Sequence, residues 1–459
     1  MRVPLRALLI PLVLASCDAP RPQGQTCQAV KTGVPAEAAV AAVGRPAGKP
    51  PSAAGGDTAP PPVRHVNRRN NPYIRDLLNA HRERQQRAPG RPTRVLAISA
   101  GGQWGAYGVG VLTGLAATAT PPSFDIVTGA STGALIAPLI FVHDYETAKR
   151  VYTTVSTDGI YRRRHVWELL WSDSLVDTAP LQETVRAIVT EDMVRKIAAE
   201  GERGRILAVA AVDLDLGDPV IFDLTAIARG QSPSCGAQVA ARDCIAAAIL
   251  AAAAIPVGFP PVYIEDEMFV DGGLRDYAFT IRVTNSTLHN PEATDRQISS
   301  NGSLALAADP DGGDGGAMEL TLIANTDFQY GTACTEDNIL GIATRTASIA
   351  IDQISVGAFY RLLSEVRSHP GNTARYTFAD PALTQCAPPR AAGTGLDAFD
   401  QQYMRCLFRR GCEMAYAGEP IWHGDANDLP HSPTARAPSP PTAALRPAVP
   451  APAICTVAD

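Results

Sequence analysis

The segment Pro122–Gly133, PSFDIVTGASTG, joins an apolar run to a glycine-rich turn. Its last five residues, GASTG, fit the pattern G-x-S-x-G, which places a serine on a sharp turn between a strand and a helix. Ser131 is therefore a candidate nucleophile, and Gly129 and Gly133 would shape the turn. The alternative is an ordinary small residue, because a chance match is not rare in a chain with 38 glycines. A base, an oxyanion site and a suitable fold must decide between the two.

Strands and helices alternate on both sides of this segment. Short apolar runs bounded by turn residues indicate buried strands, and longer runs indicate helices. The expected strands are RVLAISAGG, FDIVTGAS, RILAVAAVDLD, PVIFDL, EMFVDGG and MELTLIAN. The expected helices are GAYGVGVLTGLAATA, TGALIAPLIFV, CIAAAILAAAA (stopped by Pro256), FDQQYMRCLFRRGCEMAYAG and residues 145–155, 180–199 and 338–367. This alternation predicts an α/β fold, a three-layer α/β/α sandwich with a mostly parallel central sheet.

Composition places this sandwich between two irregular flanks. Hydrophobic residues make up 46% of the 459 residues and charged residues 19%, which suits a globular core. The 38 prolines crowd before residue 92 and after residue 419. We predict a signal peptide over 1–16, a Pro/Ala/Gly-rich tether with a basic arm over 17–92, a catalytic domain over 93–422 and a Pro-rich disordered tail over 423–459.

The N-terminus reads MRVPLRALLIPLVLASC. Two arginines precede the apolar stretch Ala7–Ala15, which is too short to span a bilayer and suits a signal peptide. The stretch ends in Leu14-Ala15-Ser16-Cys17, which resembles the lipobox of bacterial lipoproteins, with Cys17 as the lipid attachment site. This predicts a protein anchored to a bacterial membrane in the cell envelope, on the periplasmic side. The alternative is an ordinary secretory signal in which Cys17 is incidental.

Residues 64–94 form a basic arm. They carry nine arginines against two acidic residues, a local net charge of +7 in a chain whose total is −6. Beside a lipid anchor, such an arm could bind anionic headgroups at about 1 kcal/mol per charge. It could equally be a solvated arm that packs the short helix PYIRDLLNAHRERQQ against the core. We expect no nucleic-acid partner for an exported chain.

The nine cysteines become eight once Cys17 is set aside. An even number in an exported protein allows disulfides, and the local pairs would be Cys235 with Cys244 and Cys406 with Cys412. The chain has no C-x-x-C pair, and its cysteines do not cluster with histidines. We therefore expect no zinc site, and we predict no metal and no cofactor.

A serine nucleophile needs an adjacent base, and the usual base is histidine. None of the eight histidines lies in a glycine-rich or strand-end setting, although a histidine triad is not excluded. Asp271 is the alternative base, because MFVDGGL places it at the end of a strand, before two glycines. Carboxyl ends of parallel strands gather at one edge of a sheet, so Ser131 and Asp271 could meet there.

Acyl transfer also needs donors for the developing oxyanion. The sequence SAGGQWGAYG supplies a glycine loop between a strand and a helix, and the amides of Gly101 and Gly102 are the candidate donors. By itself the loop could also be a phosphate cradle or a tight turn.

These three elements, in this order, resemble the patatin-like phospholipases over about residues 93–420. Two further segments add to the resemblance, VDLDLGDPVIFDL and AAAAIPVGFPPVYIEDEMFVDGGLRDY. It implies a patatin-like fold in which Ser131 is the nucleophile, Asp271 is the base, and Gly101 and Gly102 form the oxyanion hole. The family loop often reads D-G-G-G-x-[RK]-G, whereas here Ala100 replaces the first glycine and Trp104 the basic residue. The amide donors survive both changes, but a cation near the site is lost.

The resemblance implies a membrane-anchored serine hydrolase that cleaves lipid acyl esters, similar to phospholipase A or lysophospholipase. The expected partners are a lipid or ester substrate and the membrane, reached through the anchor and the basic arm. Two alternatives stay open. One is a lipid-binding lipoprotein without hydrolytic activity, and the other is an acyltransferase that uses the same two residues.

Overall fold

The computed structural model describes residues 91–164, 172, 174–230, 239–265, 267–280, 317–328, 335, 337–368, 370–387, 399–424 and 452–457. The predicted signal peptide, Cys17, the tether and most of the basic arm lie outside the described residues. By contacts the chain divides into two units, one of Arg69–Tyr330 and Ile349–Asp459, the other of Met1–Arg68 and Gly331–Ser348. Within the second unit the structure describes residue 335 and residues 337–348, which include the start of helix α12, where the Gly341 amide donates to Asn338 Oδ1 (2.6 Å).

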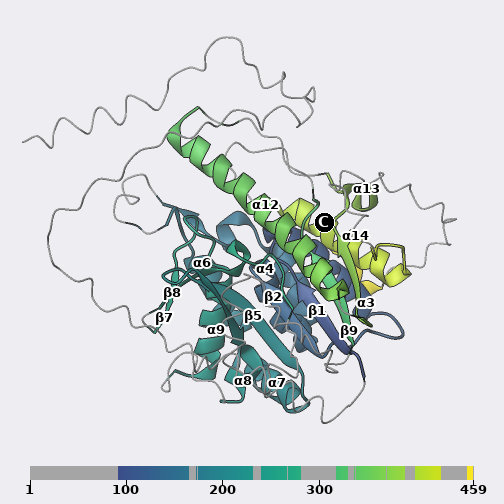
Figure 1. Ribbon diagram of the computed structural model, residues 1–459. Helices are drawn as coiled ribbons and strands as arrows, with labels where there is room; N and C mark the ends of the chain where they lie inside the picture. The colour runs from purple at the N-terminus through teal and green to yellow at the C-terminus, as the bar shows by residue number, and fades with distance from the viewer. Residues whose placement is uncertain are drawn as a thin grey trace, which may run out of the picture. The chain divides into compact units, whose positions relative to one another are not determined.

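The first unit is built on a mixed sheet whose strand order is β10-β9-β1-β2-β5-β8-β7, with β6 paired to β5 (Figure 1). The strands of this sheet are β1 (Thr93–Ile98), β2 (Ile126–Ala130), β5 (Ile206–Asp213), β6 (Asp218–Asp223), β7 (Val262–Ile264), β8 (Glu267–Asp271), β9 (Met318–Ala324) and β10 (Thr373–Phe378). The pairs from β10 to β5 are parallel, whereas β6, β7 and β8 are antiparallel to their neighbours. A short second sheet pairs β3 (Arg162–Arg163) with β4 (Val176–Asp177).

The helices of the described residues are α3 (Gly105–Ala116), α4 (Thr132–Phe141), α5 (Tyr145–Thr154), α6 (Ala179–Ile188), α7 (Glu191–Glu202), α8 (Leu224–Ala228), α9 (Ala241–Ala252), α12 (Ile339–Arg367), α13 (Pro381–Thr384) and α14 (Gln401–Ala417). Short 3-10 turns are η5 (Gly102–Trp104), η6 (Thr157–Gly159), η8 (Gly272–Leu274) and η10 (Ala453–Cys455). No helix of the described residues is both long and apolar enough to cross a membrane.

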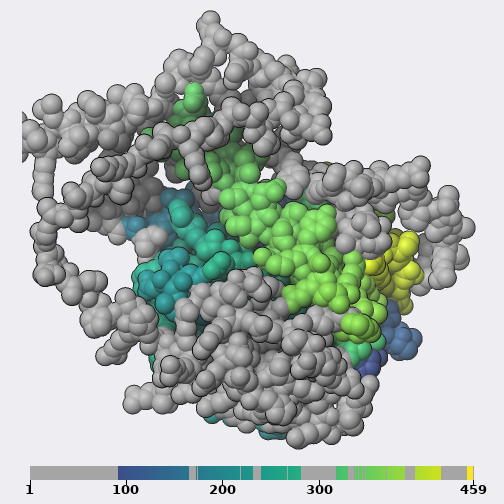
Figure 2. Space-filling view, in the orientation of Figure 1, coloured from purple at the N-terminus to yellow at the C-terminus, as the bar shows by residue number. Residues whose placement is uncertain are grey.

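The sheet separates two hydrophobic clusters, because successive side chains of a strand point to opposite faces. On β1, Leu96 and Ile98 join the larger cluster, with side chains of α3, α4, α9 and α14. Val95 and Ala97 join the smaller one, with side chains of the second half of α12. That helix is the green segment of Figure 2. Helices thus cover both faces, and the predicted three-layer α/β/α sandwich with a mostly parallel sheet is confirmed.

Several local predictions differ from the structure. The stretch 180–199 holds two helices, since Thr190 begins α7 by accepting a hydrogen bond from the Met193 amide (3.2 Å). Helix α9 ends at Ala252, four residues before Pro256. Strand β10 was not predicted, because its sequence TARYTF is short and half polar.

The disulfides correct the predicted pairing of Cys406 with Cys412. Both residues lie on α14, where six residues at about 1.5 Å each separate them by roughly 9 Å, and a disulfide needs Cα atoms within about 7 Å. The structure instead pairs Cys386 with Cys406 and Cys412 with Cys455. Cys244 is also in a disulfide, but Cys235 lies outside the described residues, so that predicted pair stays a prediction.

The Cys412–Cys455 disulfide also corrects the predicted disorder of the C-terminal tail. Residues 423–459 were expected to be disordered, yet Cys455 is fully buried and lies in the turn η10. Residues 452–457 are therefore a structured part of the domain, held to α14 through Cys412.

Candidate active site

Ser131 lies on the turn between β2 and α4. Its backbone has φ 51° and ψ −121°, a conformation that is strained for a residue with a side chain. The turn is tight enough to demand both flanking glycines. A Cβ atom at Gly133 would lie 2.1 Å from the Ile98 carbonyl oxygen, and one at Gly129 would lie 2.2 Å from the Gly133 carbonyl oxygen. Ser131 is also the N-cap residue of α4, where the helix dipole favours negative charge.

Asp271 reaches Ser131 by a route other than the one expected from parallel strand ends. Strand β8 runs antiparallel to β5, so Asp271 does not end one of the parallel strands. Strands β2 and β8 occupy the same edge of β5, because β6 holds the other edge. The pairing of β2 ends at Ala130 opposite Ala210, and the pairing of β8 begins with Asp271 opposite Ala211. The two strands therefore meet end to end, which brings Asp271 beside the residue that follows Ala130.

The end of α9 supports both residues. The Ser131 amide donates to the Ala252 carbonyl (3.1 Å), and the Asp271 amide donates to the Ala254 carbonyl (2.8 Å). The Ser131 side chain lies close enough to the Asp271 carboxyl to lower its pKa. Asp271 Oδ1 also accepts from the Gly273 amide (2.7 Å). The carboxylate is thus held in one orientation toward the serine hydroxyl.

Burial changes the acidity of this carboxyl. Asp271 is only 4% exposed, and burial raises its pKa from 3.8 to about 6, against the opposing hydrogen bonds from Ser131 and the Gly273 amide. A higher pKa makes the carboxylate a stronger base than an ordinary aspartate, and at neutral pH it is still mostly ionised.

The glycine loop after β1 leaves two amides available. The Ala100 amide donates to the Tyr277 carbonyl (2.8 Å) and is therefore occupied. Among the described residues, no acceptor engages the amides of Gly101 and Gly102. Gly101 has φ 144°, and a Cβ atom there would lie 1.7 Å from the Asn325 carbonyl oxygen, so only glycine fits. Trp104, at the position where the family often has a cation, packs against the larger hydrophobic cluster.

Tyr152 links this loop to the nucleophile turn. Its buried hydroxyl donates to the Thr132 carbonyl (3.0 Å) and shares a hydrogen bond with Thr132 Oγ1 (2.5 Å). Thr132 Oγ1 in turn donates to the Gly102 carbonyl (3.1 Å). Because Thr132 follows Ser131 directly, this chain of hydrogen bonds sets the distance between the nucleophile and the loop amides.

Ser131 and Gly102 line the same narrow pocket. The rest of its lining is largely apolar and comes from α4, α5 and the segment after it, α6, the segment after α9, Phe399 and α14. These apolar residues are Leu135, Val151, Val155, Ile160, Leu181, Ile188, Ala253, Ile255, Phe259, Phe399 and Met404. Such a lining suits a hydrocarbon chain whose ester group rests beside the serine hydroxyl.

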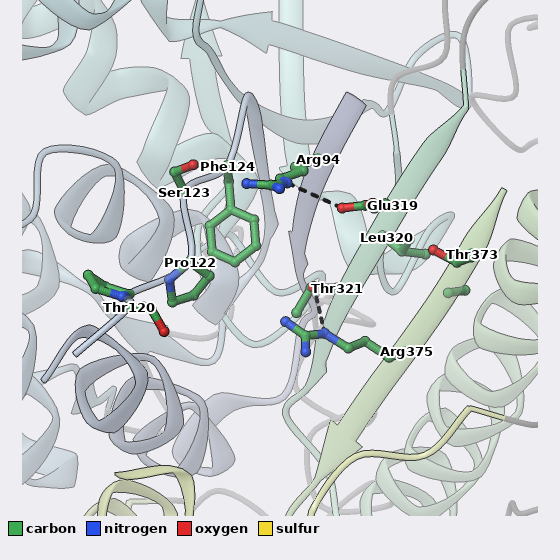
Figure 3. Close-up of a pocket in the computed structure, with 12 residues that line it drawn as sticks. Arg94, Thr120, Pro122, Ser123, Phe124, Glu319, Leu320, Thr321, Thr373 and Arg375 are labelled. Carbon is green, nitrogen blue, oxygen red and sulfur yellow. Dashed lines mark hydrogen bonds and ion pairs between the residues drawn. The ribbon is translucent and has the colours of Figure 1, made fainter. Parts of the chain in front are cut away.

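A larger hollow of about 580 Å³ lies at the other end of the parallel strands (Figure 3). It opens over the first residues of β1, β9 and β10, and Arg94 pairs there with Glu319 (3.2 Å). Arg375 donates to Thr321 Oγ1 (3.1 Å) and stacks over the Trp422 ring at 4.4 Å. Its lining contains neither Ser131 nor Asp271, so the chemistry of the site belongs to the narrow apolar pocket.

Two histidines lie in the described part of the chain, His143 and His423. His143 follows the far end of α4, roughly 15 Å along the helix from Ser131. His423 stacks on Tyr376 at 5.2 Å. Neither lines the apolar pocket, so Asp271 is the base candidate that these residues offer.

The sequence indicated the two candidate catalytic side chains and the loop, but not the residues that support them. Tyr152 and Asn325 were missed. The backbone amide of Asn325 donates to Ser99 Oγ (2.7 Å), and its side-chain Nδ2 donates to the Ser99 carbonyl (2.8 Å). These two bonds fix the start of the glycine loop. A lone tyrosine in a helix and an asparagine after a strand carry no motif, so no local signal could have shown these roles.

The site thus combines a strained serine at a strand–turn–helix junction, a buried carboxylate, and loop amides that no acceptor of the described residues engages. Residues 96–280 match the family model described as Patatin-like phospholipase, and this range holds Ser131, Asp271 and the glycine loop. The chain therefore contains a patatin-like phospholipase domain over these residues, which supports lipid acyl hydrolase activity.

Two further comparisons add little to that assignment. No curated protein matches the chain. Among solved structures, the crystal structure of VipD from Legionella pneumophila matches at 12% identity with a TM-score of 0.32, covering 72% of this chain and 67% of that one. That likeness is too slight to carry an argument.

Proposed function

We propose that the protein cleaves acyl esters of lipids through a Ser131–Asp271 dyad. The observation that carries the proposal is the proximity of the Ser131 side chain to the buried Asp271 carboxyl, beside a pocket lined by apolar side chains. A hydroxyl needs a base within hydrogen-bonding reach, and an acyl chain needs apolar lining. The site meets both requirements.

The first step is acylation of Ser131. Asp271 takes the hydroxyl proton while Oγ attacks the ester carbonyl carbon. The resulting oxyanion accepts hydrogen bonds from the amides of Gly101 and Gly102, near the positive end of α4, and each such donor contributes about 3 kcal/mol. The ester bond then breaks, and the leaving alcohol takes the proton from Asp271.

The second step is hydrolysis of the acyl-enzyme. Asp271 takes a proton from water, and the hydroxide adds to the acyl carbon. The Ser131–acyl bond breaks, the fatty acid leaves, and Ser131 regains its proton from Asp271. In sum, one ester and one water give one acid and one alcohol. Without a cation in the loop, neutral esters and lysolipids fit better than an anionic headgroup.

The proposal also includes a lipid anchor at Cys17. The lipobox-like sequence before Cys17 supports lipidation at that cysteine, which would hold the domain on the periplasmic side of a bacterial membrane. Acylation would be seen as a mass increase of the mature N-terminus that Cys17→Ser removes. An unmodified cysteine in the mature protein would leave an ordinary secreted hydrolase.

The test of the dyad is turnover of p-nitrophenyl esters of increasing chain length, beside labelling by a fluorophosphonate. Ser131→Ala should lose both, and Asp271→Asn should lose turnover. Matched controls are Ser174→Ala and Asp276→Asn, since both residues are buried and neither lines the pocket. If folded wild type is neither labelled nor active, the lipid-binding alternative replaces this proposal. Adding an acceptor alcohol distinguishes hydrolysis from acyl transfer, because only acyl transfer forms an ester of that alcohol.

A further inference from the structure

The loop after α9 exposes an apolar side chain beside the pocket. Val257 is 72% exposed and has φ 66°, a backbone conformation that disfavours β-branched residues. Neither burial nor backbone preference explains a valine there, since glycine would adopt this turn without strain. Ile255, two residues earlier, is 37% exposed and lines the pocket that holds Ser131. The exposed apolar surface therefore continues into the catalytic pocket.

Hydrogen bonds hold this loop in place. The Leu175 amide donates to the Val257 carbonyl (3.0 Å), and the Val176 amide donates to the Gly258 carbonyl (3.1 Å). The Phe259 amide closes the turn on the Ile255 carbonyl (2.8 Å). The apolar side chains thus sit on a fixed turn.

Three consecutive arginines, Arg162–Arg164, lie on strand β3 and directly after it. Strand β4 pairs on its other side with β3, where Arg163 is opposite Val176, and the Arg164 amide donates to the Leu175 carbonyl (3.3 Å). Two interstrand spacings place the backbone of these arginines roughly 10 Å from Val257. The side chains of Arg162 and Arg163 are exposed. Asp158 and Asp177 are the acidic residues nearest in sequence to these strands among the described residues, so the two strands and their flanks hold three arginines and two aspartates.

We propose that Val257, with Arg162 and Arg163, forms a docking surface for an anionic lipid bilayer. The inference rests on the proposed function, because its purpose is to bring the mouth of the apolar pocket to the membrane that holds the substrate. Val257 enters the acyl region just below the headgroups, and the arginines bind lipid phosphates. An acyl chain then passes from the bilayer along Ile255 toward Ser131 without crossing water.

The occupant is a bilayer because this surface combines an apolar tip, flanking cations and continuity with the pocket. Lipid interfaces offer hydrocarbon beneath negative charge at this spacing. The residues of the docking surface follow β1 in the chain, whereas the proposed lipid anchor and the basic arm precede or overlap its start.

The test introduces a fluorescent tryptophan at the exposed position of Val257. Val257→Trp and the control Val239→Trp are made in the full chain carrying Cys17→Ser, so that no acyl chain is attached. Val239 is also exposed but precedes α9, about 18 Å along the helix from the Val257 loop. The vesicles contain equal parts of phosphatidylcholine and phosphatidylglycerol with brominated acyl chains, which quench only tryptophans that enter the bilayer.

We expect quenching and a blue shift for Val257→Trp and neither for Val239→Trp. In the Val257→Trp chain, Arg162→Gln and Arg163→Gln should each weaken vesicle affinity about fivefold. Val257→Gly should lower turnover on vesicle lipid about tenfold while it leaves turnover of soluble p-nitrophenyl butyrate unchanged.

Each failure has its own meaning. If soluble ester is cleaved but the two tryptophans respond alike to vesicles, this docking surface is refuted and the hydrolase stands. If the Val257→Trp chain is quenched but soluble ester is not cleaved, the surface stands and the proposed hydrolysis fails.

Discussion

Asp271→Asn should make the domain more stable at pH 8 while it abolishes turnover. Burial raises the pKa of Asp271 from 3.8 to about 6, whereas the unfolded chain has an ordinary value. A group with a raised native pKa stabilises the fold below its unfolded pKa, and this contribution is lost as the pH rises through 6. The difference of about two units corresponds to about 3 kcal/mol. Asparagine keeps the shape without the charge, so the gain should reach about 3 kcal/mol at pH 8.

The assay is urea unfolding followed by tryptophan fluorescence, at pH 8 and at pH 4. At pH 4 the advantage of Asp271→Asn should shrink to about 0.5 kcal/mol, because the native carboxyl is then already protonated. Ser131→Ala is the control, since it also abolishes turnover but keeps the buried charge, and it should gain no stability. An Asp271→Asn variant that is no more stable than wild type at pH 8 would refute the reasoning, because the carboxylate would then not be poorly solvated.

Two further predictions concern the same site, and a third concerns a disulfide of α14. Turnover of a soluble ester should rise about tenfold per pH unit below pH 6 and level off above it, as Asp271 loses its proton; a flat profile between pH 4 and 8 would contradict this. Tyr152→Phe should lower kcat about tenfold with KM within twofold, through misplacement of the loop amides, and cost about 1–2 kcal/mol of stability in urea unfolding; unchanged kcat would limit Tyr152 to packing. Replacing Cys386 and Cys406 by serine opens a loop of 20 residues and should cost about 3 kcal/mol, seen as a lower Tm; an unchanged Tm would show that the packing of α14 suffices.

Local sequence patterns predicted the parts of the domain that depend on local physics. Buried parallel strands need continuous apolar residues, so β1, β2, β5 and β9 could be read from the chain. The glycines around Ser131 were predictable for the same kind of reason, because their backbone path excludes a Cβ atom.

Long-range geometry limited the rest of the prediction. The meeting of Ser131 with Asp271 was expected from parallel strand ends, but it depends on β8 joining the same edge of β5 as β2 in the opposite direction. No property of EMFVDGG shows strand direction. The pairing of Cys412 with Cys455 likewise depends on where a distant segment packs. Sequence patterns identified the reacting residues because motifs carry them, and missed the supporting ones because only the fold brings them together.

The energetics of the site weigh against a family member that has lost its activity. A serine at φ 51°, a buried carboxylate and a glycine packed against a carbonyl each oppose folding. The α9 carbonyls, Tyr152 and Asn325 hold them in place. A protein that only binds lipid gains nothing from a buried charge, and asparagine at position 271 would relieve about 3 kcal/mol. Mutations that relax an unused site accumulate without penalty, so its strained residues would be among the first to change. Their presence together around the Ser131 turn supports the proposed hydrolysis, and fluorophosphonate labelling that Ser131→Ala removes is the direct check.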